Sequence, residues 1–250
     1  MSNSTLAGPP GECCRKTVHH VGTPRGALED IAGVKTYIAR PTSDNVSRII
    51  LFFSDVYGAL YTNSQLVMDY WADNGYLVLG LDYFEGDSKA LLNLDDSTFD
   101  YRGWVKRKEA RAAVLVPPWI KAVRERYGTE MKYTCVGYCF GAPYVMDLLK
   151  TDWIVAGAFG HPAFLNEDHF RGIQRPLFMS CAEIDHTFPL ESRRKAEDIL
   201  VEQKATYHIQ IFSSVQHGFA LRGDPTVPAE KWAKEESARA ILDWFSHFCG

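Results

Sequence analysis

The stretch Thr134–Pro143 reads TCVGYCFGAP and joins a run of strand-forming residues to a turn in which glycines flank a cysteine. Gly137 stands two residues before Cys139, and Gly141 stands two residues after it. A sharp turn between a strand and a helix needs glycine at both positions, because its backbone passes close to neighbouring elements where only a hydrogen atom fits. The stretch therefore predicts a nucleophile elbow with cysteine as the nucleophile.

The hydrophobic pattern alternates between strands and helices along the chain. Val34–Ala39 has the pattern of a half-buried strand, and near-continuous apolar runs predict buried strands at Arg48–Phe53 and Tyr76–Leu81. The other predicted strands are 133–137, 154–159, 177–181 and 206–212, and the predicted helices are 63–72, 103–126, 140–150, 190–203 and 229–248. This alternation predicts the α/β class, with a mostly parallel central sheet covered by helices on both faces.

Length and composition indicate one folded domain. Of the 250 residues, 46 % are hydrophobic and 13 % aromatic, which suffices for a large core, and no shift in composition marks an internal boundary. Residues 1–12 are rich in glycine, proline and serine and are expected to form a loose tail. The domain is therefore expected to span residues 13–250.

Charge and hydropathy argue against a nucleic-acid or membrane partner. The net charge is −4 and the basic residues are scattered, whereas nucleic-acid binding needs clustered Lys and Arg. Arg107–Lys108 and Arg193–Lys195 are expected on exposed helix faces. The sequence has neither a run near the ~18 apolar residues of a membrane span nor a basic start followed by an apolar segment, so a cytoplasmic location is expected.

The six cysteines are expected to be free thiols, because they form neither a dense disulfide framework nor two CxxC pairs. For the same reason no metal site is expected, and the role of the adjacent Cys13 and Cys14 stays open. Cys135 lies inside a predicted strand, and Cys181 ends one without flanking glycines. Both are expected to be packing thiols.

Ligands bind outside the carboxyl ends of the strands in open α/β sheets, so the residues that follow each strand are the candidates for a site. Cys139 follows one predicted strand, Asp185 a later one and His217 the last one. The order nucleophile, acid, base is that of the α/β-hydrolase fold, and the two protease folds with the same residues use other orders. These residues are predicted to form a catalytic triad, with the thiol at a helix N-terminus that favours the thiolate.

Neighbouring residues offer alternatives for the acid and the base. His186 adjoins Asp185 and His161 follows a predicted strand, so either could serve as the base. His217 is preferred because it comes after the last strand. Glu183 could replace Asp185 as the acid, although it falls nearer the strand.

The loop Ser54–Gly58 follows the second predicted strand, where α/β-hydrolases supply an amide of the oxyanion hole. The predicted donors are the backbone N–H groups of Val56 and Phe140. Asp55 could accept a hydrogen bond from the thiol of Cys139 and so modulate it, or it could cap a turn.

Aromatic side chains gather near the predicted strand ends and either line a pocket for a flat unsaturated or aromatic ester or belong to the core. They are Tyr57, Tyr61, Tyr83, Phe84, Tyr138 and Phe219, and all except Tyr61 are candidate substrate contacts.

Two other segments have no assigned role. His19 and His20 precede the first clear strand, and the sequence indicates no partner for them. Glu85–Tyr101 is long and acidic and carries leucines that could cover a pocket. It could be a lid or a surface excursion.

Together the motifs resemble the dienelactone hydrolase family. They are SDVYG at 54–58, LDYF at 81–84, GYCFG at 137–141, AEID at 182–185 and QHGFA at 216–220. The resemblance covers roughly residues 34–248, and the segment from Cys13 to Gly26 looks like the extension of the eukaryotic, particularly fungal, members.

The resemblance implies a cysteine hydrolase of small lactones or esters with a Cys-His-Asp triad and no cofactor or metal. It also implies that Asp55 stands where bacterial relatives carry a glutamate that holds the resting thiol. Arg222 matches one of the arginines that hold a substrate carboxylate in those relatives, although it is one position further from His217 than expected. The other arginine has no counterpart after Tyr83–Phe84.

The expected partner is therefore a small-molecule ester or lactone, and the expected assembly is a monomer or a homodimer. Two alternatives remain. The same site could serve cyclisation or acyl transfer in a natural-product pathway, or the protein could bind a ligand without turnover, because fold alone does not prove activity.

Overall fold

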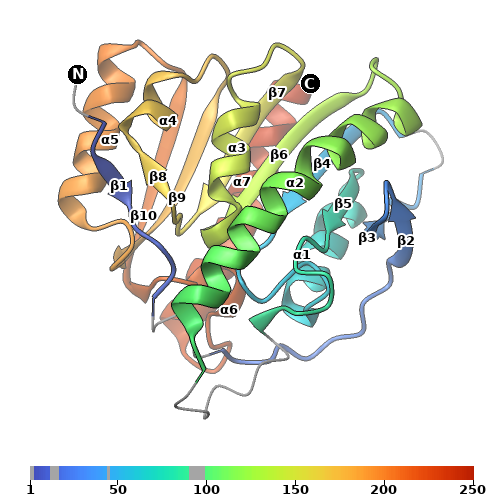
Figure 1. The fold of residues 1–250 in the computed structure, drawn as a ribbon, viewed down its shortest axis with the longest axis horizontal. Coiled ribbons are helices and arrows are strands. Elements are labelled where there is room, and N and C mark those ends of the chain that lie inside the picture. Colours follow the sequence, from blue (N-terminus) through green and yellow to red (C-terminus); the bar gives the residue numbers. More distant parts are fainter. Residues whose placement is uncertain (1–2, 12–16, 44–45, 90–98) are drawn as a thin grey trace.

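An eight-stranded sheet forms the centre of the computed structural model, which describes residues 3–11, 17–43, 46–89 and 99–250. Its strands are β2 (Ala27–Ile31), β3 (Val34–Ala39), β4 (Arg48–Phe53), β5 (Leu77–Leu81), β6 (Lys132–Tyr138), β7 (Ile154–Gly160), β9 (Leu177–Ile184) and β10 (Tyr207–Gln216). They lie in the order β10-β9-β7-β6-β4-β5-β3-β2 (Figure 1). Neighbours from β10 to β5 are parallel, and β3 pairs antiparallel with both β5 and β2.

This sheet confirms the predicted α/β class. β3 and β4 begin and end at the predicted residues, β3 with the pattern of a half-buried strand and β4 with a near-continuous apolar run. β9 and β10 continue past the predicted ends to Ile184 and Gln216. Their last residues are largely exposed, so the apolar pattern stops before the strands do.

Helices cover both faces of the sheet, as predicted. α1 (Thr62–Asp73) and α7 (Pro228–Cys249) pack on one face, and α2 (Tyr101–Tyr127), α3 (Ala142–Leu148) and α5 (Leu190–Glu202) pack on the other. Figure 1 shows α2 and α3 in front of the sheet and α7 behind it. The shorter elements are α4 (Glu167–Arg171), α6 (Phe219–Arg222) and a 3-10 turn at Cys139–Gly141.

The start of the chain differs from the prediction. β1 (Thr5–Ala7) pairs antiparallel with β8 (Leu165–Asn166), and the side chains of Leu6 and Ala7 are buried in the core on the α5 side. The expectation of a loose tail over residues 1–12 is therefore wrong for Thr5–Ala7. Paired backbone groups and a buried leucine hold these residues, and neither is visible from a composition rich in small residues.

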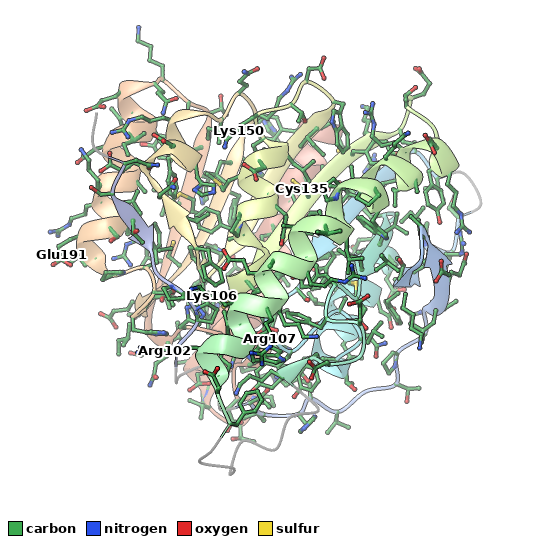
Figure 2. The ribbon with its side chains drawn as sticks, viewed as in Figure 1. Arg102, Lys106, Arg107, Cys135, Lys150 and Glu191 are labelled. Carbon is green, nitrogen blue, oxygen red and sulfur yellow. The ribbon has the colours of Figure 1, made fainter. Side chains whose placement is uncertain are left out.

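The exposure of the basic residues differs between α2 and α5. Arg102, Lys106 and Arg107 lie on the first half of α2 (Figure 2) and are exposed. Arg193 on α5 is buried, and its guanidinium donates to the carbonyl oxygen of Ala182 at 3.1 Å. The expectation of an exposed face is therefore wrong at Arg193, and the side chain of Lys108 on α2 is only 14 % exposed. Among the helices in the described ranges, none combines the length and the apolarity needed to cross a membrane.

Candidate active site

Four parallel strands bring the predicted site residues to one edge of the sheet. β6 ends directly before Cys139, β9 directly before Asp185 and β10 directly before His217. β4 ends before Ser54, the first residue of the loop that carries Asp55. Because the carboxyl ends of parallel strands share one edge, this edge gathers the predicted nucleophile, acid and base.

Cys139 has the strained backbone of a nucleophile elbow. Its φ is +48°, in the left-handed region that residues other than glycine rarely adopt. A Cβ added at Gly137 would lie 2.5 Å from the carbonyl oxygen of Gly141, and one added at Gly141 would lie 2.2 Å from that of Phe53. The backbone therefore has no room for a side chain at either glycine, as the sequence pattern predicts.

The other described cysteines, Cys135, Cys181 and Cys249, are also free and buried. Burial raises the pKa of the Cys135 and Cys249 thiols and raises that of Cys181 to about 12. Cys135 lies inside β6 in the interior of the molecule (Figure 2). This environment fits the packing role expected for Cys135 and Cys181. Cys13 and Cys14 lie outside the described residues.

His217 and Asp185 form a buried hydrogen bond. The Nδ1 atom of His217 lies 2.9 Å from Oδ1 and 3.0 Å from Oδ2 of Asp185. The two side chains are 1 % and 2 % exposed. A carboxylate at Nδ1 keeps the proton of a neutral imidazole on that atom and leaves Nε2 as the basic nitrogen. The structure thus joins the predicted acid to the predicted base.

Thr187 supports this pair and was not among the predicted residues. Its hydroxyl oxygen lies 2.7 Å from Asp185 Oδ1 and 2.7 Å from the carbonyl oxygen of Pro162, and its single proton can serve one of them at a time. The backbone N–H groups of Thr187 and Phe188 donate to Oδ1 at 2.9 and 3.1 Å. An aspartate that accepts from the N–H two residues later is a common turn, so the order Asp-x-Thr was the available sequence signal.

These contacts set the protonation state of Asp185. Burial alone would raise the pKa of its carboxyl group. The charge and the hydrogen bond of His217, together with the hydrogen bonds from Thr187 and Phe188, act in the opposite direction and hold this pKa below its ordinary value. Asp185 is therefore ionised near neutral pH and can stabilise a positive charge on His217.

The alternative residues lie around the pair. The ring centroid of His161 is 4.9 Å from that of His217, and the centroid of His186 is 5.2 Å from it. His186 is exposed, whereas His161 is fully buried. Glu183, the alternative acid, is exposed and accepts a hydrogen bond from the backbone N–H of Ser214 at 2.7 Å. The observed acid–base contact therefore favours the first assignment.

Asp185, His186 and His217 also place three potential metal-ligand atoms within 4.8 Å of one another. A carboxylate and two imidazoles are suitable ligands for a transition metal. Two of the three already form the hydrogen bond described above. The absence of a metal and of a cofactor stays a prediction from the sequence.

Asp55 and Arg222 form a second buried pair. Arg222 Nε donates to Asp55 Oδ2 at 2.9 Å, and the side chains are 3 % and 1 % exposed. Asp55 Oδ1 accepts from the backbone N–H of Tyr57 at 2.9 Å. A Cβ at Gly218 would lie 2.2 Å from Arg222 Nη2, so the glycine after His217 leaves space for the guanidinium. The sequence singled out both partners but gave no sign that they pair.

The predicted oxyanion-hole residues lie at the ends of two adjacent strands, β4 and β6. Val56 is buried in a turn closed by a hydrogen bond from Gly58 N–H to the carbonyl oxygen of Asp55 at 3.0 Å. The carbonyl of Val56 accepts from the N–H of Lys89 at 2.9 Å. Phe140 is buried in the 3-10 turn of the elbow. The use of the two N–H groups as oxyanion donors stays a prediction.

Tyr83 connects these two strand ends. Its hydroxyl donates to the backbone carbonyl of Ser54, and the side chain is fully buried. Burial raises the pKa of the Tyr83 hydroxyl well above its ordinary value. The hydrogen bond with Ser54 acts in the opposite direction. The ring of Tyr83 also packs on the ring of Phe140, the residue after Cys139, with centroids 5.3 Å apart.

The remaining aromatic candidates are buried near the strand ends. Tyr83 and Phe84 pack edge to face with centroids 4.8 Å apart. Tyr138 and Phe219 both contact His161, at 5.6 and 5.9 Å between centroids. All of these rings are at most 3 % exposed, so they form the floor of the site or the core beneath it. Their contact with a substrate stays a prediction.

Two cations lie near the ring of Tyr57. The Cζ atom of Arg222 is 4.9 Å from the ring centroid, and the Nζ atom of Lys89 is 6.0 Å from it. Lys89 is only 1 % exposed and also lies 4.9 Å from the ring of Tyr101. Lys89 was not among the predicted residues, because a single lysine in a loop carries no sequence signal.

The segment 85–101 is described only in part, because residues 90–98 lie outside the described residues. Its first residues are tied to α2, where Glu85 forms hydrogen bonds to Arg111 at 2.7 and 2.8 Å and Asp87 forms an ion pair with Lys108 at 2.9 Å. The choice between a lid and a surface excursion depends on the undescribed part and stays a prediction.

Comparison with known proteins gives a consistent result. The model of the dienelactone hydrolase family matches residues 34–249. Dienlactone hydrolase 1 of Gibberella moniliformis is 37 % identical over 98 % of this chain and 96 % of its own length, and Dienlactone hydrolase 2 of the same fungus is 36 % identical over 97 % of each. A solved structure of a putative dienelactone hydrolase from Klebsiella pneumoniae superposes with a TM-score of 0.73 at 16 % identity, covering 90 % of this chain and 99 % of that one. The structural likeness supports the fold.

Proposed function

The chain belongs to the dienelactone hydrolase family and is a hydrolase, and on this basis we propose that it cleaves small carboxylic esters or lactones through a thioester on Cys139. The observation that carries the proposal is the buried hydrogen bond between Asp185 and His217 at the sheet edge where Cys139 occupies a strained elbow. A nucleophile, a base and an acid that orients the base are the elements of covalent acyl transfer, and their chain order here is nucleophile, acid, base.

The first half of the reaction forms the acyl-enzyme. Nε2 of His217 accepts the proton of the Cys139 thiol, and the thiolate attacks the carbonyl carbon of the ester. The carbonyl electrons move to the oxygen, and the N–H groups of Val56 and Phe140 stabilise the resulting oxyanion. One such donor lowers the barrier by about 3 kcal/mol. When the C–O bond breaks, His217 gives its proton to the leaving oxygen.

The second half releases the acid. His217 accepts a proton from a water molecule, whose oxygen attacks the thioester carbonyl. The C–S bond breaks, and the Cys139 sulfur recovers its proton from His217. Asp185 stabilises the imidazolium in both halves, which its low pKa allows.

The Asp55–Arg222 pair holds the resting thiol and recognises the substrate. Asp55 accepts the hydrogen bond of the resting Cys139 thiol, and Arg222 faces an anionic group of the substrate. The ion pair supports this assignment, because a substrate anion that attracts Arg222 would weaken its hold on Asp55. Asp55 is one methylene shorter than the glutamate expected at this position from bacterial relatives. Asp55→Glu should therefore strengthen the hydrogen bond between the carboxylate and the Cys139 thiol and lower activity.

The aromatic residues favour a flat unsaturated or aromatic ester. Tyr57, Tyr83, Phe84, Tyr138 and Phe219 would provide the pocket wall and floor. The preference is tested by turnover of matched aromatic and flexible aliphatic esters. Equal kcat/KM values for both series would exclude it.

The central experiment is hydrolysis of a nitrophenyl acetate, a dienelactone and an aromatic lactone. Native protein should turn over at least one of them, Cys139→Ala should not, and Cys181→Ala, which removes a packing thiol, should keep the activity. Mass spectrometry of quenched reactions should find the acyl group on the Cys139 peptide. Activity that survives in Cys139→Ala would contradict the mechanism.

Product mass separates the alternatives. Hydrolysis adds one water to the substrate, whereas cyclisation or acyl transfer does not. Binding of all three compounds without turnover would identify a ligand-binding protein. A cytoplasmic location stays a prediction, which cell fractionation tests. A monomeric or homodimeric state also stays a prediction, which light scattering tests.

A further inference from the structure

The N-terminal segment from Thr17 to His20 makes specific contacts, although the sequence indicated none. The hydroxyl of Tyr61 lies 3.0 Å from Thr17 Oγ1 and 3.2 Å from His19 Nδ1. The ring of His19 also packs edge to face on the ring of Tyr61, with centroids 5.2 Å apart. Two side chains of the segment therefore hold one hydroxyl group at the start of α1.

The same segment is fixed on both sides of this contact. The N–H of His20 donates to Asn63 Oδ1 at 3.0 Å, and Asn63 Nδ2 donates to the carbonyl of Val18 at 2.9 Å. His20 Nε2 lies 2.8 Å from the carbonyl oxygen of Gly223, at the end of α6. The segment thus bridges α1 and α6, the short helix that begins two residues after His217.

Ring contacts connect Tyr61 to the candidate active site. It is 7 % exposed, and its ring lies 5.1 Å from the ring of Tyr57. Tyr57 in turn lies against Arg222, whose guanidinium carbon is 4.9 Å from the ring centroid. Burial raises the pKa of the Tyr61 hydroxyl, the contact with Thr17 lowers it, and the charges of Asp55 and Arg222 also act on it.

We propose that Thr17 and His19 are positioning residues, which hold the Tyr61–Tyr57 aromatic wall of the active site through the Tyr61 hydroxyl. A hydroxyl held between a second hydroxyl and an imidazole nitrogen keeps the far end of its ring in one place, and the edge-to-face contact with the ring of His19 restrains the rotation of the Tyr61 ring. The wall then presents a preformed surface to the acyl or lactone ring of the substrate. The inference rests on the proposed function, because it assigns the wall to the substrate of that reaction.

The kinetic test uses three variants. His19→Ala and Thr17→Val each remove one partner of the Tyr61 hydroxyl, and Tyr61→Phe removes the hydroxyl itself. We expect KM to rise about tenfold in His19→Ala and Tyr61→Phe with little change in kcat, because the wall binds ground state and transition state alike. Combining His19→Ala with Tyr61→Phe should add nothing to the effect of Tyr61→Phe alone. His19→Asn, whose amide can reach the same hydroxyl, should restore most of the KM.

Arg25→Ala is the matched control, because Arg25 lies shortly after this segment and makes an exposed ion pair with Asp73, on α1. It should leave KM unchanged. An unchanged KM in His19→Ala would overturn the proposal, and so would additive effects of His19→Ala and Tyr61→Phe. A loss in His19→Ala that only follows a lower melting temperature would also overturn it.

A second measurement needs no turnover and separates this inference from the proposed function. In protein with 13C-labelled tyrosine rings, the Tyr61 signal is identified by its loss in Tyr61→Phe. His19→Ala should speed the ring flip of Tyr61, because the edge-to-face contact is lost, and His19→Phe, which keeps a ring at this position, should slow it again. Unchanged ring dynamics in His19→Ala would refute the positioning role even in a protein whose Cys139 proves essential. Faster dynamics with an active Cys139→Ala would refute the proposed mechanism alone.

Discussion

Arg222 and Asp55 form an ion pair at 2.9 Å in which the side chains are 3 % and 1 % exposed. Asp55 lies in the loop after β4, and Arg222 ends α6, the short helix after β10; β4 and β10 lie four positions apart in the sheet order. The pair therefore ties one flank of the elbow to the loop that carries the proposed base. A charge buried this deeply is tolerated because it is paired, and its loss has consequences for stability as well as activity.

Arg222→Met should destabilise the fold by about 3–5 kcal/mol, because it leaves the Asp55 carboxylate buried without its ion pair. Asp55→Asn combined with Arg222→Met should recover much of this loss. Urea unfolding measures both. The control is Arg239→Met, which removes exposed ion pairs to Glu236 and Asp243 and should cost less than about 1 kcal/mol. Equal losses at the two arginines would contradict the prediction.

Cys139→Gly should be more stable than Cys139→Ala by about 1 kcal/mol, because glycine relieves the positive φ that alanine retains. At Cys135, inside β6, the order should reverse, with glycine less stable than alanine by about 0.5–1 kcal/mol. Thermal or urea unfolding of the four variants provides the comparison. The same order at both cysteines would argue against strain at the elbow.

Thr187→Val should destabilise the protein by about 1–3 kcal/mol, because the carbonyl of Pro162 and the carboxylate of Asp185 lose a buried hydroxyl contact. Activity should fall as well, since Asp185 then orients His217 less firmly. Thr187→Ser keeps the hydroxyl and should retain most of both. Unfolding curves and kcat values on one panel ester test this. A valine variant that keeps the native stability and kcat would contradict this role of the hydroxyl.

Asp185 should make the free energy of unfolding fall at acid pH. Its folded pKa lies below the ordinary value, so the unfolded state binds its proton first as the pH falls. The stability contributed by this group is fully present above the unfolded pKa, about 3.9, and is lost as the pH falls through the lower folded pKa. In Asp185→Asn this loss is absent.

The measurement is the free energy of unfolding in urea at several pH values from neutral down to below 3.9, for the native protein and Asp185→Asn. The difference between them should be constant at higher pH and shrink below about pH 4. A difference that stays constant throughout this acid range would disprove a lowered pKa.

Much of the fold and part of the candidate site could be predicted from the sequence. β4 was predicted to the residue because an uninterrupted apolar run has one physical explanation, a strand covered on both faces. The elbow was visible because backbone crowding imposes glycine at fixed positions around Cys139. Asp185 and His217 were found because each comes shortly after a predicted strand, in the chain order of a triad, and the observed strands continue to the residue before each of them.

The contacts that were not predicted join segments that are distant in the sequence. The Arg222–Asp55 pair spans 167 positions and the His19–Tyr61 contact spans 42, and neither has a local pattern. β1 is three residues long and owes its strand form to pairing with β8, which composition cannot show. Thr187 had a local signal in the turn after Asp185, but that signal is common in loops.

The pairing of β1 with β8 also has a consequence for the order in which the protein assembles during its synthesis. Thr5 pairs with Asn166 and Ala7 with Leu165, so β1 leaves the ribosome long before its partner β8 has been synthesised. Closing so long a loop costs chain entropy, and contacts of this kind form late in folding. The beginning of the chain is therefore among the last parts to reach its native place.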